Sequence, residues 1–194
     1  MKIAFVRELE NKRIRIGVGG GEEVLKYSVS ASLAHSMGLC CGMELDEGAL
    51  EAIANEDASY RCMKRALSLL SYGDNTKSAL YMKLLRSGFA RDMAKACVEE
   101  CLRLGYIDEG RQIERAVLNE ANRSLRGRSY IIKKLVSRGY RSGEVSSVID
   151  GLVLSGEVDF SENFELLCRR RGASTEDERR ALSYKMGYRS GDFD

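Results

Sequence analysis

The sequence predicts a mainly α-helical protein built from tandem three-helix repeats in an elongated, curved stack, with a small antiparallel β segment at its N-terminus. Three observations lead to this prediction. Apolar and charged residues alternate near the start of the chain, apolar residues recur at helical spacing from about residue 60 onward, and the peptide Gly-Tyr-Arg-Ser-Gly occurs at both 139–143 and 187–191. The chain contains no proline, so glycines and capping residues must mark the ends of its elements.

The first thirty residues predict three short strands. Apolar runs lie at 3–6 (IAFV), 14–18 (IRIGV) and 24–29 (VLKYSV), and polar or glycine-rich segments separate them. In the second run, Arg13 and Arg15 alternate with isoleucines, which directs charge to one face of a strand and apolar side chains to the other. The segment GVGGGEE at 17–23 lacks the spacing of a phosphate-binding loop, so we interpret it as a turn between strands.

Helical patterns follow the strands. A short helix is expected around 30–37, ended by Gly38, and another begins at Asp46 with Leu50 and Ile53 on one face. They lead into a long helical segment whose predicted buried stripe consists of Met63, Ala66, Leu67 and Leu70.

From residue 60 the chain repeats itself. A shift of 51 residues places Lys83 on Lys134 and Gly88 on Gly139, and a further shift of 48 places Gly139-Tyr140 on Gly187-Tyr188. Each copy has apolar stripes for three helices. The predicted organisation is an N-terminal extension at 1–59, repeats at 60–112 and 113–163, and a third, truncated repeat at 164–194.

The duplicated peptide has a structural interpretation. Its first glycine supplies the left-handed position after the second helix of a repeat, and its aromatic ring packs back between helices. Ser142 is predicted to cap the third helix, and Thr175 with Glu178 is predicted to form a capping box in the last repeat.

Composition excludes several classes of protein. With 194 residues, 44% of them hydrophobic and 31% charged, the chain is expected to be a globular cytoplasmic protein without a membrane segment. His35 is the only histidine, and neither a catalytic set nor a cofactor or metal site can be assembled around it. Cys97 and Cys101 lie four residues apart and could share a ligand, but we interpret them, and Cys40-Cys41, as small buried hydrophobic residues.

Charge gives the strongest functional signal. Residues 1–60 carry 6 basic and 10 acidic side chains, which leaves 25 basic and 19 acidic ones for 61–194. The segment 121–143 is basic without a single acidic residue, and a second basic group follows in the next repeat. Such faces attract phosphate backbones or acidic protein surfaces, although a solvated helix face is the alternative. The predicted contact residues are Arg126, Arg128, Lys133, Lys134, Arg138, Arg141, Arg169, Arg170, Arg171 and Arg189.

The segment ALSLLSYGDNTKSALYMKLLRSGF, followed by a helix and LGYIDE, resembles the repeat of the RecX regulatory proteins. The upstream pattern VSASLAHSMGLCCGMELDEGALEAI, with its preceding β segment, is similar to the N-terminal extension of many members of that family. The similarity therefore covers nearly the whole chain, through the order and spacing of many weak matches.

The resemblance implies a non-enzymatic regulator that binds RecA–DNA filaments and modulates, in most members by inhibition, the ATPase and strand-exchange activities of RecA in recombination and DNA repair. We also expect a monomer without cofactors, with single- or double-stranded DNA as a further partner through phosphate contacts. Two alternatives stay open, namely a stand-alone DNA-binding helical module and a helical-repeat scaffold for another acidic protein.

Overall fold

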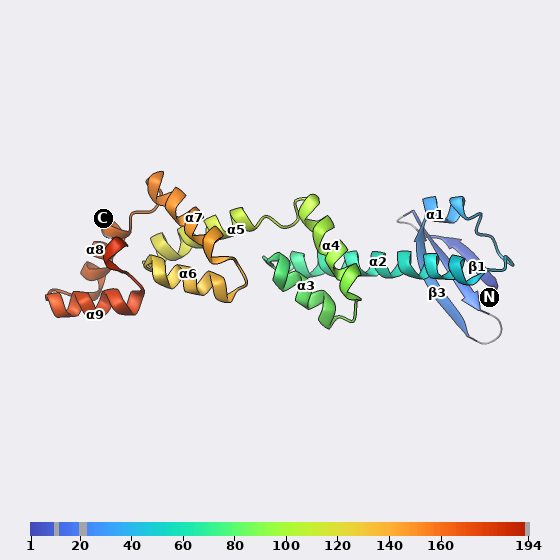
Figure 1. Cartoon of the computed structure of the whole chain (residues 1–194), viewed down its shortest axis with the longest axis horizontal. Coiled ribbons are helices and arrows are strands. Elements are labelled where there is room, and N and C mark those ends of the chain that lie inside the picture. The colour runs from blue at the N-terminus through green and yellow to red at the C-terminus, as the bar shows by residue number, and fades with distance from the viewer. Residues whose placement is uncertain (10–11, 20–22, 193–194) are drawn as a thin grey trace. The chain divides into compact units, whose positions relative to one another are not determined.

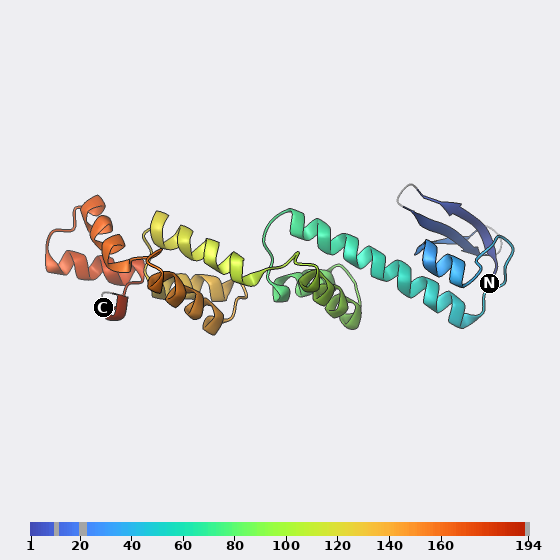
Figure 2. The same ribbon diagram turned by 90° about the horizontal axis from the view of Figure 1, so that it is seen from above.

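The computed structural model describes residues 1–9, 12–19 and 23–192 (Figures 1 and 2). The predicted turn around Gly20 to Glu22 and the last two residues lie outside the described residues. By contacts the chain divides into two compact units, one formed by 1–73 with 81–101 and the other by 74–80 with 102–194. The elements are β1 (Ile3–Glu8), β2 (Arg13–Gly19), β3 (Val24–Ser30), α1 (Ala31–Ser36), α2 (Glu47–Ser71), α3 (Lys77–Arg86), α4 (Arg91–Arg103), α5 (Glu109–Leu118), the π-helical turn η1 (Asn119–Arg123), α6 (Arg128–Ser137), α7 (Ser142–Leu154), α8 (Phe160–Arg171), α9 (Glu176–Met186) and the short 3-10 turn η2 (Ser190–Asp192).

The first unit begins with the predicted antiparallel meander. The strands pair in the order β1-β2-β3, and Ile16 of β2 lies opposite Val6 of β1 and Tyr27 of β3. The alternation of the second strand works as expected, because Ile16 is fully buried while Arg15 is exposed. Helix α1, capped by Ser30, and helix α2, capped by Asp46, begin where the sequence predicts them.

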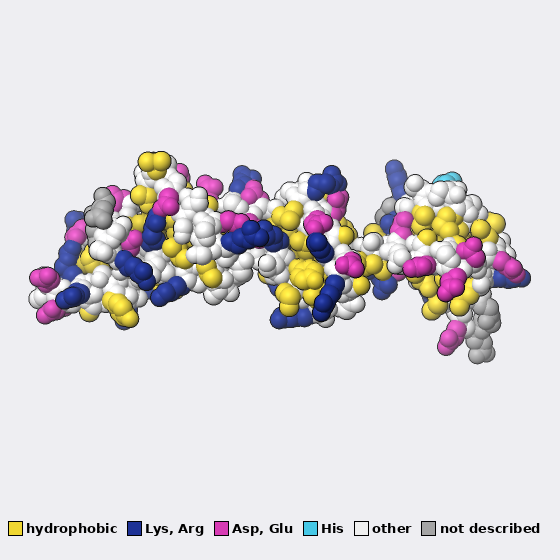
Figure 3. All heavy atoms as spheres, in the orientation of Figure 1, with side chains coloured by type: hydrophobic (Ala, Val, Ile, Leu, Met, Phe, Trp, Pro, Cys, Tyr) yellow, Lys and Arg dark blue, Asp and Glu magenta, His cyan; other side chains and the backbone are white. Residues whose placement is uncertain are grey.

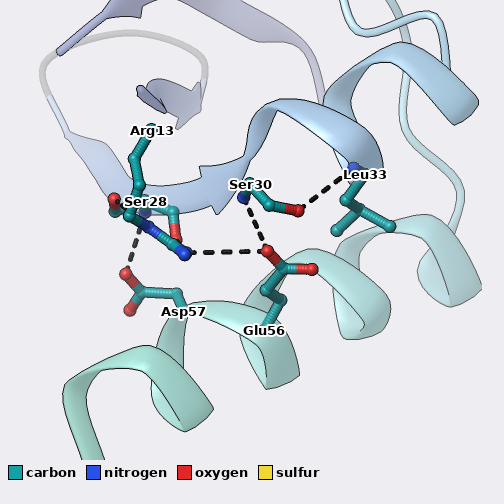
Figure 4. Close-up of polar contacts among 6 residues, drawn as sticks. All are labelled: Arg13, Ser28, Ser30, Leu33, Glu56 and Asp57. Atoms are coloured by element: carbon teal, nitrogen blue, oxygen red, sulfur yellow. Dashed lines mark hydrogen bonds and ion pairs between the residues drawn. The ribbon is translucent and has the colours of Figure 1, made fainter. Parts of the chain in front are cut away.

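Helix α2 covers the edge of β3 with two carboxylates (Figure 4). The backbone N–H of Ser28 donates to Oδ1 of Asp57 at 2.8 Å, and that of Ser30 donates to Oε1 of Glu56 at 2.6 Å. Arg13 of β2 lies 3.6 Å from the same Glu56 oxygen and donates to the Ser28 carbonyl oxygen at 2.6 Å. Because an edge strand presents unpaired N–H groups, these carboxylates satisfy β3 and protect it from pairing with another chain.

The buried stripe of α2 differs from the predicted one. Ala66 is buried as expected, but Leu67 is 37% exposed, whereas Cys62, which the predicted stripe omits, is fully buried. Positions 62 and 66 lie one turn apart on the same face, and Leu67 lies about 100° further around the helix. The prediction for Leu67 is therefore wrong.

The helical repeats are present, and together with the small antiparallel sheet they confirm the predicted mainly α-helical fold class. Helices α3 and α6 begin and end at positions that differ by 51 residues, as do α4 and α7. Helices α5 and α8 also begin 51 residues apart. The precise repeat boundaries at 59, 112 and 163 stay predictions.

The Gly-Tyr pairs lie where successive helices meet within the second unit. Gly139 and Gly187 have φ angles of +98° and +83°, and the tyrosines that follow them are buried. The Tyr140 hydroxyl donates to the Gln112 side chain at 2.8 Å, and the Tyr188 ring packs on Phe164 at 4.9 Å between ring centroids. The aromatic ring thus packs between helices, as predicted.

Other local predictions have mixed outcomes. The capping box of Thr175 and Glu178 is present in full. Ser142 is not the capping residue of α7 but its first helical residue, and Arg141 precedes it without a capping side-chain bond. Cys40 and Cys41 are exposed, so the prediction that they are buried is wrong, because they lie in the turn between α1 and α2 rather than on a helix face.

Candidate basic interaction surface

The ten basic residues predicted from the sequence all belong to the second unit. Six come from the segment around α6, from the loop before it to the first residue before α7. Three end α8, and one follows α9. Figure 3 shows Lys and Arg side chains spread over the α6, α8 and α9 region, with acidic and apolar side chains between them.

Besides Lys134, three of these residues have partners inside the unit. Arg128 at the start of α6 forms an ion pair with Asp150 of α7. Arg141 lies 3.7 Å from Glu144, one turn away. The Arg126 guanidinium stacks over the Tyr130 ring, 4.3 Å from its centroid. Arg126 therefore contributes to packing at the start of α6.

Among the ten predicted residues, Lys134 contributes most clearly to the stability of the unit itself. Its Nζ lies 2.7 Å from Oε1 of Glu120, whose side chain is only 11% exposed, and 5.6 Å from the Tyr130 ring centroid. A carboxylate with so little access to water needs a cationic partner, because leaving it unpaired costs several kcal/mol, on the order of 3–5. Lys134 thus neutralises Glu120 and serves a contact within the unit.

The remaining basic side chains are exposed. Arg138 and Lys133 project from α6, and Arg189 follows the buried Tyr188. The three arginines that end α8 are exposed as well. At a helix C-terminus they also compensate the negative end of the helix dipole, which explains part of their presence without a partner molecule. The exposed set, as we use the term below, is Lys133, Arg138, Arg141, Arg169, Arg170, Arg171 and Arg189.

A recurring pair of exposed side chains was missed by the sequence reasoning. Val136 of α6 is 42% exposed and Tyr184 of α9 is 90% exposed, and they occupy the same position in successive repeats, 48 residues apart. Arg141 and Arg189 follow them five residues later in each copy. Exposed aromatic side chains and arginines are both enriched at contact surfaces. The 48-residue register was the signal that could have identified these positions.

Ion pairing also joins the last two helices. The Arg179 guanidinium of α9 hydrogen-bonds to Glu165 of α8, which lowers the pKa of that carboxyl group and raises the pKa of Arg179. The same guanidinium lies 5.4 Å from the centroid of the Phe164 ring. Arg179 therefore stabilises the packing of α9 against α8.

The arrangement supports binding through charge and apolar contact. Within the described ranges, no group of three or more His, Cys, Asp and Glu side chains has the geometry to hold a metal ion. No helix in the described part of the chain has both the length and the apolar character needed to cross a bilayer.

Curated relatives support the family resemblance. The Bacillus mycoides protein named regulatory protein RecX is 29% identical over 133 residues, which cover 69% of this chain and 49% of that protein. The proteins of the same name from Bacillus cytotoxicus and Clostridium tetani are 27% and 25% identical, covering 79% and 69% of this chain and 56% and 60% of their own lengths. The chain thus spans about half to three fifths of the length of these relatives. No protein-family model matches the chain.

Two solved structures share the fold. The crystal structure of a regulatory protein RecX superposes with a TM-score of 0.72 and 21% identity, covering 100% of this chain and 97% of that one. The structure of RecX from Lactobacillus salivarius gives a TM-score of 0.58 and 20% identity over 71% of this chain and 93% of that one. The resemblance to the RecX regulatory family that the residues indicated is therefore confirmed, in sequence over more than two thirds of the chain and in fold over all of it.

Proposed function

We propose that this protein is a non-enzymatic regulator that binds RecA–DNA filaments and inhibits the ATPase and strand-exchange activities of RecA. The observation that carries the proposal is its similarity, in sequence and in fold, to proteins named regulatory protein RecX. Cationic side chains recur along the helical repeats of the second unit, which suits a partner that is itself a repeating, negatively charged polymer.

The exposed set, together with Val136 and Tyr184, is the proposed contact surface. Arg126, Arg128 and Lys134 belong to the ten predicted residues, but they already stack or pair within the unit. Removing one of them would change stability as well as binding. Side chains of the exposed set can bind phosphates or carboxylates without first breaking an internal contact as strong as those of Arg126, Arg128 and Lys134. The closest internal pair of the exposed set, Arg141 with Glu144, is exposed and separated by 3.7 Å, so it contributes little.

The direct test is the single-stranded-DNA-dependent ATPase of RecA in the presence of this protein. We expect substoichiometric wild-type protein to lower the rate. The triple variant Arg138→Glu, Arg141→Glu, Arg189→Glu should require at least about tenfold more protein for the same inhibition, because each reversal replaces an attraction by a repulsion. Helical content measured by circular dichroism should be unchanged.

A matched control changes the same charge elsewhere. Lys64, Arg91 and Lys95 are exposed residues of the first unit, and their reversal to Glu alters the net charge by the same amount. This control should inhibit like the wild type. If both triple variants lose inhibition of the ATPase equally, the effect comes from net charge, and the exposed set is not the contact surface. An unchanged ATPase rate with wild-type protein would contradict the proposed function itself.

The alternative of a stand-alone DNA-binding module is distinguished by leaving RecA out. A regulator of the filament should bind the RecA–DNA filament more tightly than the same DNA alone at one salt concentration. Equal or tighter binding to bare DNA, with no effect on the ATPase, would favour the DNA-binding module.

A further inference from the structure

Three buried thiols lie together in the first unit. Cys62 comes from α2, and Cys97 and Cys101 come from α4. The Cys97 thiol is in hydrogen-bonding contact with Cys62 on one side and Cys101 on the other. Cys101 Sγ in turn lies 3.8 Å from the Met63 sulfur. Sulfur atoms from two helices therefore meet at one place.

The repeat register shows that the fold does not require sulfur there. The equivalent positions of the next repeat, 51 residues later, carry Ile113, Val148 and Leu152. Ile113 and Leu152 are buried and Val148 packs against the same core. These larger aliphatic side chains bury more apolar surface than cysteine does. The packing role alone therefore does not explain why all three positions carry cysteine in the first repeat.

The three thiols do not form a metal site, since no suitable ligand group of three occurs in the described part of the chain. Cys97 and Cys101 are also poorly placed for a disulfide with each other. Residues four apart on a helix have Cβ atoms about 5–6 Å apart, whereas a disulfide needs roughly 3.5–4.5 Å. The thiols of Cys62 and Cys97 come from different helices and are in hydrogen-bonding contact, whereas Cys62 and Cys101 have no such contact, so Cys62 and Cys97 are the pair that we expect to form a bond.

The Cys97 thiol is also reachable. The residue as a whole is 7% exposed and lines an open groove of about 350 Å³ between α2 and α4. Met63, Met93 and Ala96 line the same groove. A small oxidant can therefore approach Cys97 from the groove, whereas Cys62 and Cys101 are fully buried.

We propose that Cys62 and Cys97 are a redox-modification site, a dithiol that a low-molecular-weight disulfide oxidises to a bond joining α2 to α4. The Cys97 thiolate attacks one sulfur of the small disulfide, whose other half leaves as a thiolate and takes up the proton that Cys97 released. The Cys62 thiolate then attacks the Cys97 sulfur and expels the second half, which takes up the proton from Cys62. Two protein thiols become one disulfide, and the small disulfide is reduced to two thiols.

Burial sets the speed of this reaction. It raises the pKa of the Cys97 thiol to about 12 and that of Cys101 to about 11. Only the thiolate attacks, so the reaction is slow at neutral pH. The site therefore responds to sustained oxidation rather than to a brief exposure.

The test uses the full chain in a Cys40→Ser, Cys41→Ser background, which removes the exposed thiols. After prolonged incubation with oxidised glutathione, the intact mass should fall by about 2 Da as two hydrogens are lost. Digestion without reduction at glutamates leaves Cys62 and Cys97 in one peptide, 57–99, and Cys101 in another, so the loss of about 2 Da should appear in the 57–99 peptide alone. No mass loss, or only a stable glutathione adduct, would overturn the proposal.

Matched variants take their residues from the next repeat. Cys62→Ile and Cys97→Val should each abolish the mass loss, whereas Cys101→Leu should retain it. If the bond is lost in Cys101→Leu but kept in Cys62→Ile, the disulfide joins the two cysteines of α4. That outcome would contradict the proposed bond between α2 and α4. The first mass measurement uses the protein that keeps Cys62, Cys97 and Cys101, so its result does not depend on whether a variant at these positions folds.

Discussion

At the scale of single residues, Gly127 shows how closely the last two repeats approach. A Cβ added to Gly127 would lie 2.4 Å from the Tyr188 backbone nitrogen and 2.5 Å from the Gly187 carbonyl oxygen. The Gly127 N–H donates to the Met186 carbonyl oxygen at 3.0 Å, and the Ser129 N–H donates to that of Gly187 at 3.1 Å. The second Gly-Tyr pair therefore docks by backbone contact on the start of α6.

This contact predicts a sharp effect of one methyl group. Gly127→Ala should lower the free energy of unfolding by about 2 kcal/mol, because the obstructing atoms are backbone and cannot rotate away. Gly151→Ala in α7 is the matched control, since a Cβ there meets nothing within 4 Å. It should raise stability by about 0.5–1 kcal/mol, as alanine favours the helix. Urea unfolding of both variants gives the comparison, and equal effects would contradict the close approach.

A second residue-scale prediction concerns pH. Because the raised pKa of Cys97 keeps its thiol protonated, the rate of its alkylation by iodoacetamide should increase about tenfold per unit between pH 7 and pH 10. Mass spectrometry of the fragment that contains Cys97 measures this rate. A rate that levels off near pH 8.5, where a solvated thiol ionises, would mean that the thiol is not desolvated.

At the scale of elements, local side chains accept hydrogen bonds from the backbone N–H groups at the N-terminus of α9. The Thr175 side chain accepts from the Glu178 N–H at 3.3 Å, and Oε2 of Glu178 accepts from the N–H groups of Ser174 and Thr175 at 2.9 and 3.0 Å. Helix α3 has a local cap as well, because the Thr76 hydroxyl accepts from the Ala79 N–H at 3.0 Å, and its Lys77 N–H donates in addition at 2.8 Å to Glu109 of α5. The start of α3 is thus capped both locally and from another helix, whereas the bonds at the start of α9 are local.

Local capping makes α9 sensitive to acid. The backbone N–H groups of Thr175 and Ser174 hold the pKa of Glu178 below its usual value. A carboxyl group with a lowered folded-state pKa stabilises the fold above its unfolded pKa, and that contribution is lost as pH falls through the folded value. Glu178→Gln should therefore flatten the decline of α9 helicity between about pH 5 and pH 3. Circular dichroism follows the decline, with exposed Glu162→Gln as control.

At the scale of the whole molecule, charge has two separate uses. Pairs such as Lys134 with Glu120 and Arg179 with Glu165 hold helices of the second unit together. Among the described residues, the exposed arginines that follow the buried tyrosines form no ion pair with a buried carboxylate, and the Glu144 side chain that lies near Arg141 is 41% exposed. Binding to a polyanionic filament is proposed to depend on the second group, because only these side chains can release counterions from phosphates without loosening the fold.

Salt dependence measures this use of charge. The logarithm of the dissociation constant for the RecA–DNA filament should rise linearly with the logarithm of salt concentration. For the triple reversal of Arg138, Arg141 and Arg189, the slope should fall by about one for each phosphate contact that is lost. The reversal of Lys64, Arg91 and Lys95 should leave the slope unchanged. Identical slopes for the three proteins would remove phosphate contact from the proposed function.

Much of the fold follows from local sequence signals. Alternating residues predicted the three strands, and Asp46 and Thr175 predicted the helix starts at which they lie. The 51-residue register predicted helices that recur with the same offset. Each of these signals acts through a residue's own backbone or a neighbour within four positions, so the sequence contains them directly.

The role of each basic side chain was decided by tertiary structure. Lys133 and Lys134 are adjacent in the sequence, yet one is exposed and the other neutralises a buried carboxylate 14 residues away. A helix turns by about 100° per residue, so neighbours in sequence face different surroundings. A run of basic residues in the sequence therefore does not show which side chains pair inside the unit and which are exposed. The exposure of Val136 and Tyr184 was not predicted for the same reason.

By itself the sequence indicated the strands, most of the helices and several of their caps, and that a helical unit recurs, because caps, turns and periodicity are short-range properties. Only the tertiary structure brought Cys62 to Cys97 and joined Gly127 to Tyr188. Contacts between residues 35 and 61 positions apart depend on how helices pack, and packing direction is not encoded in any one stretch of the chain.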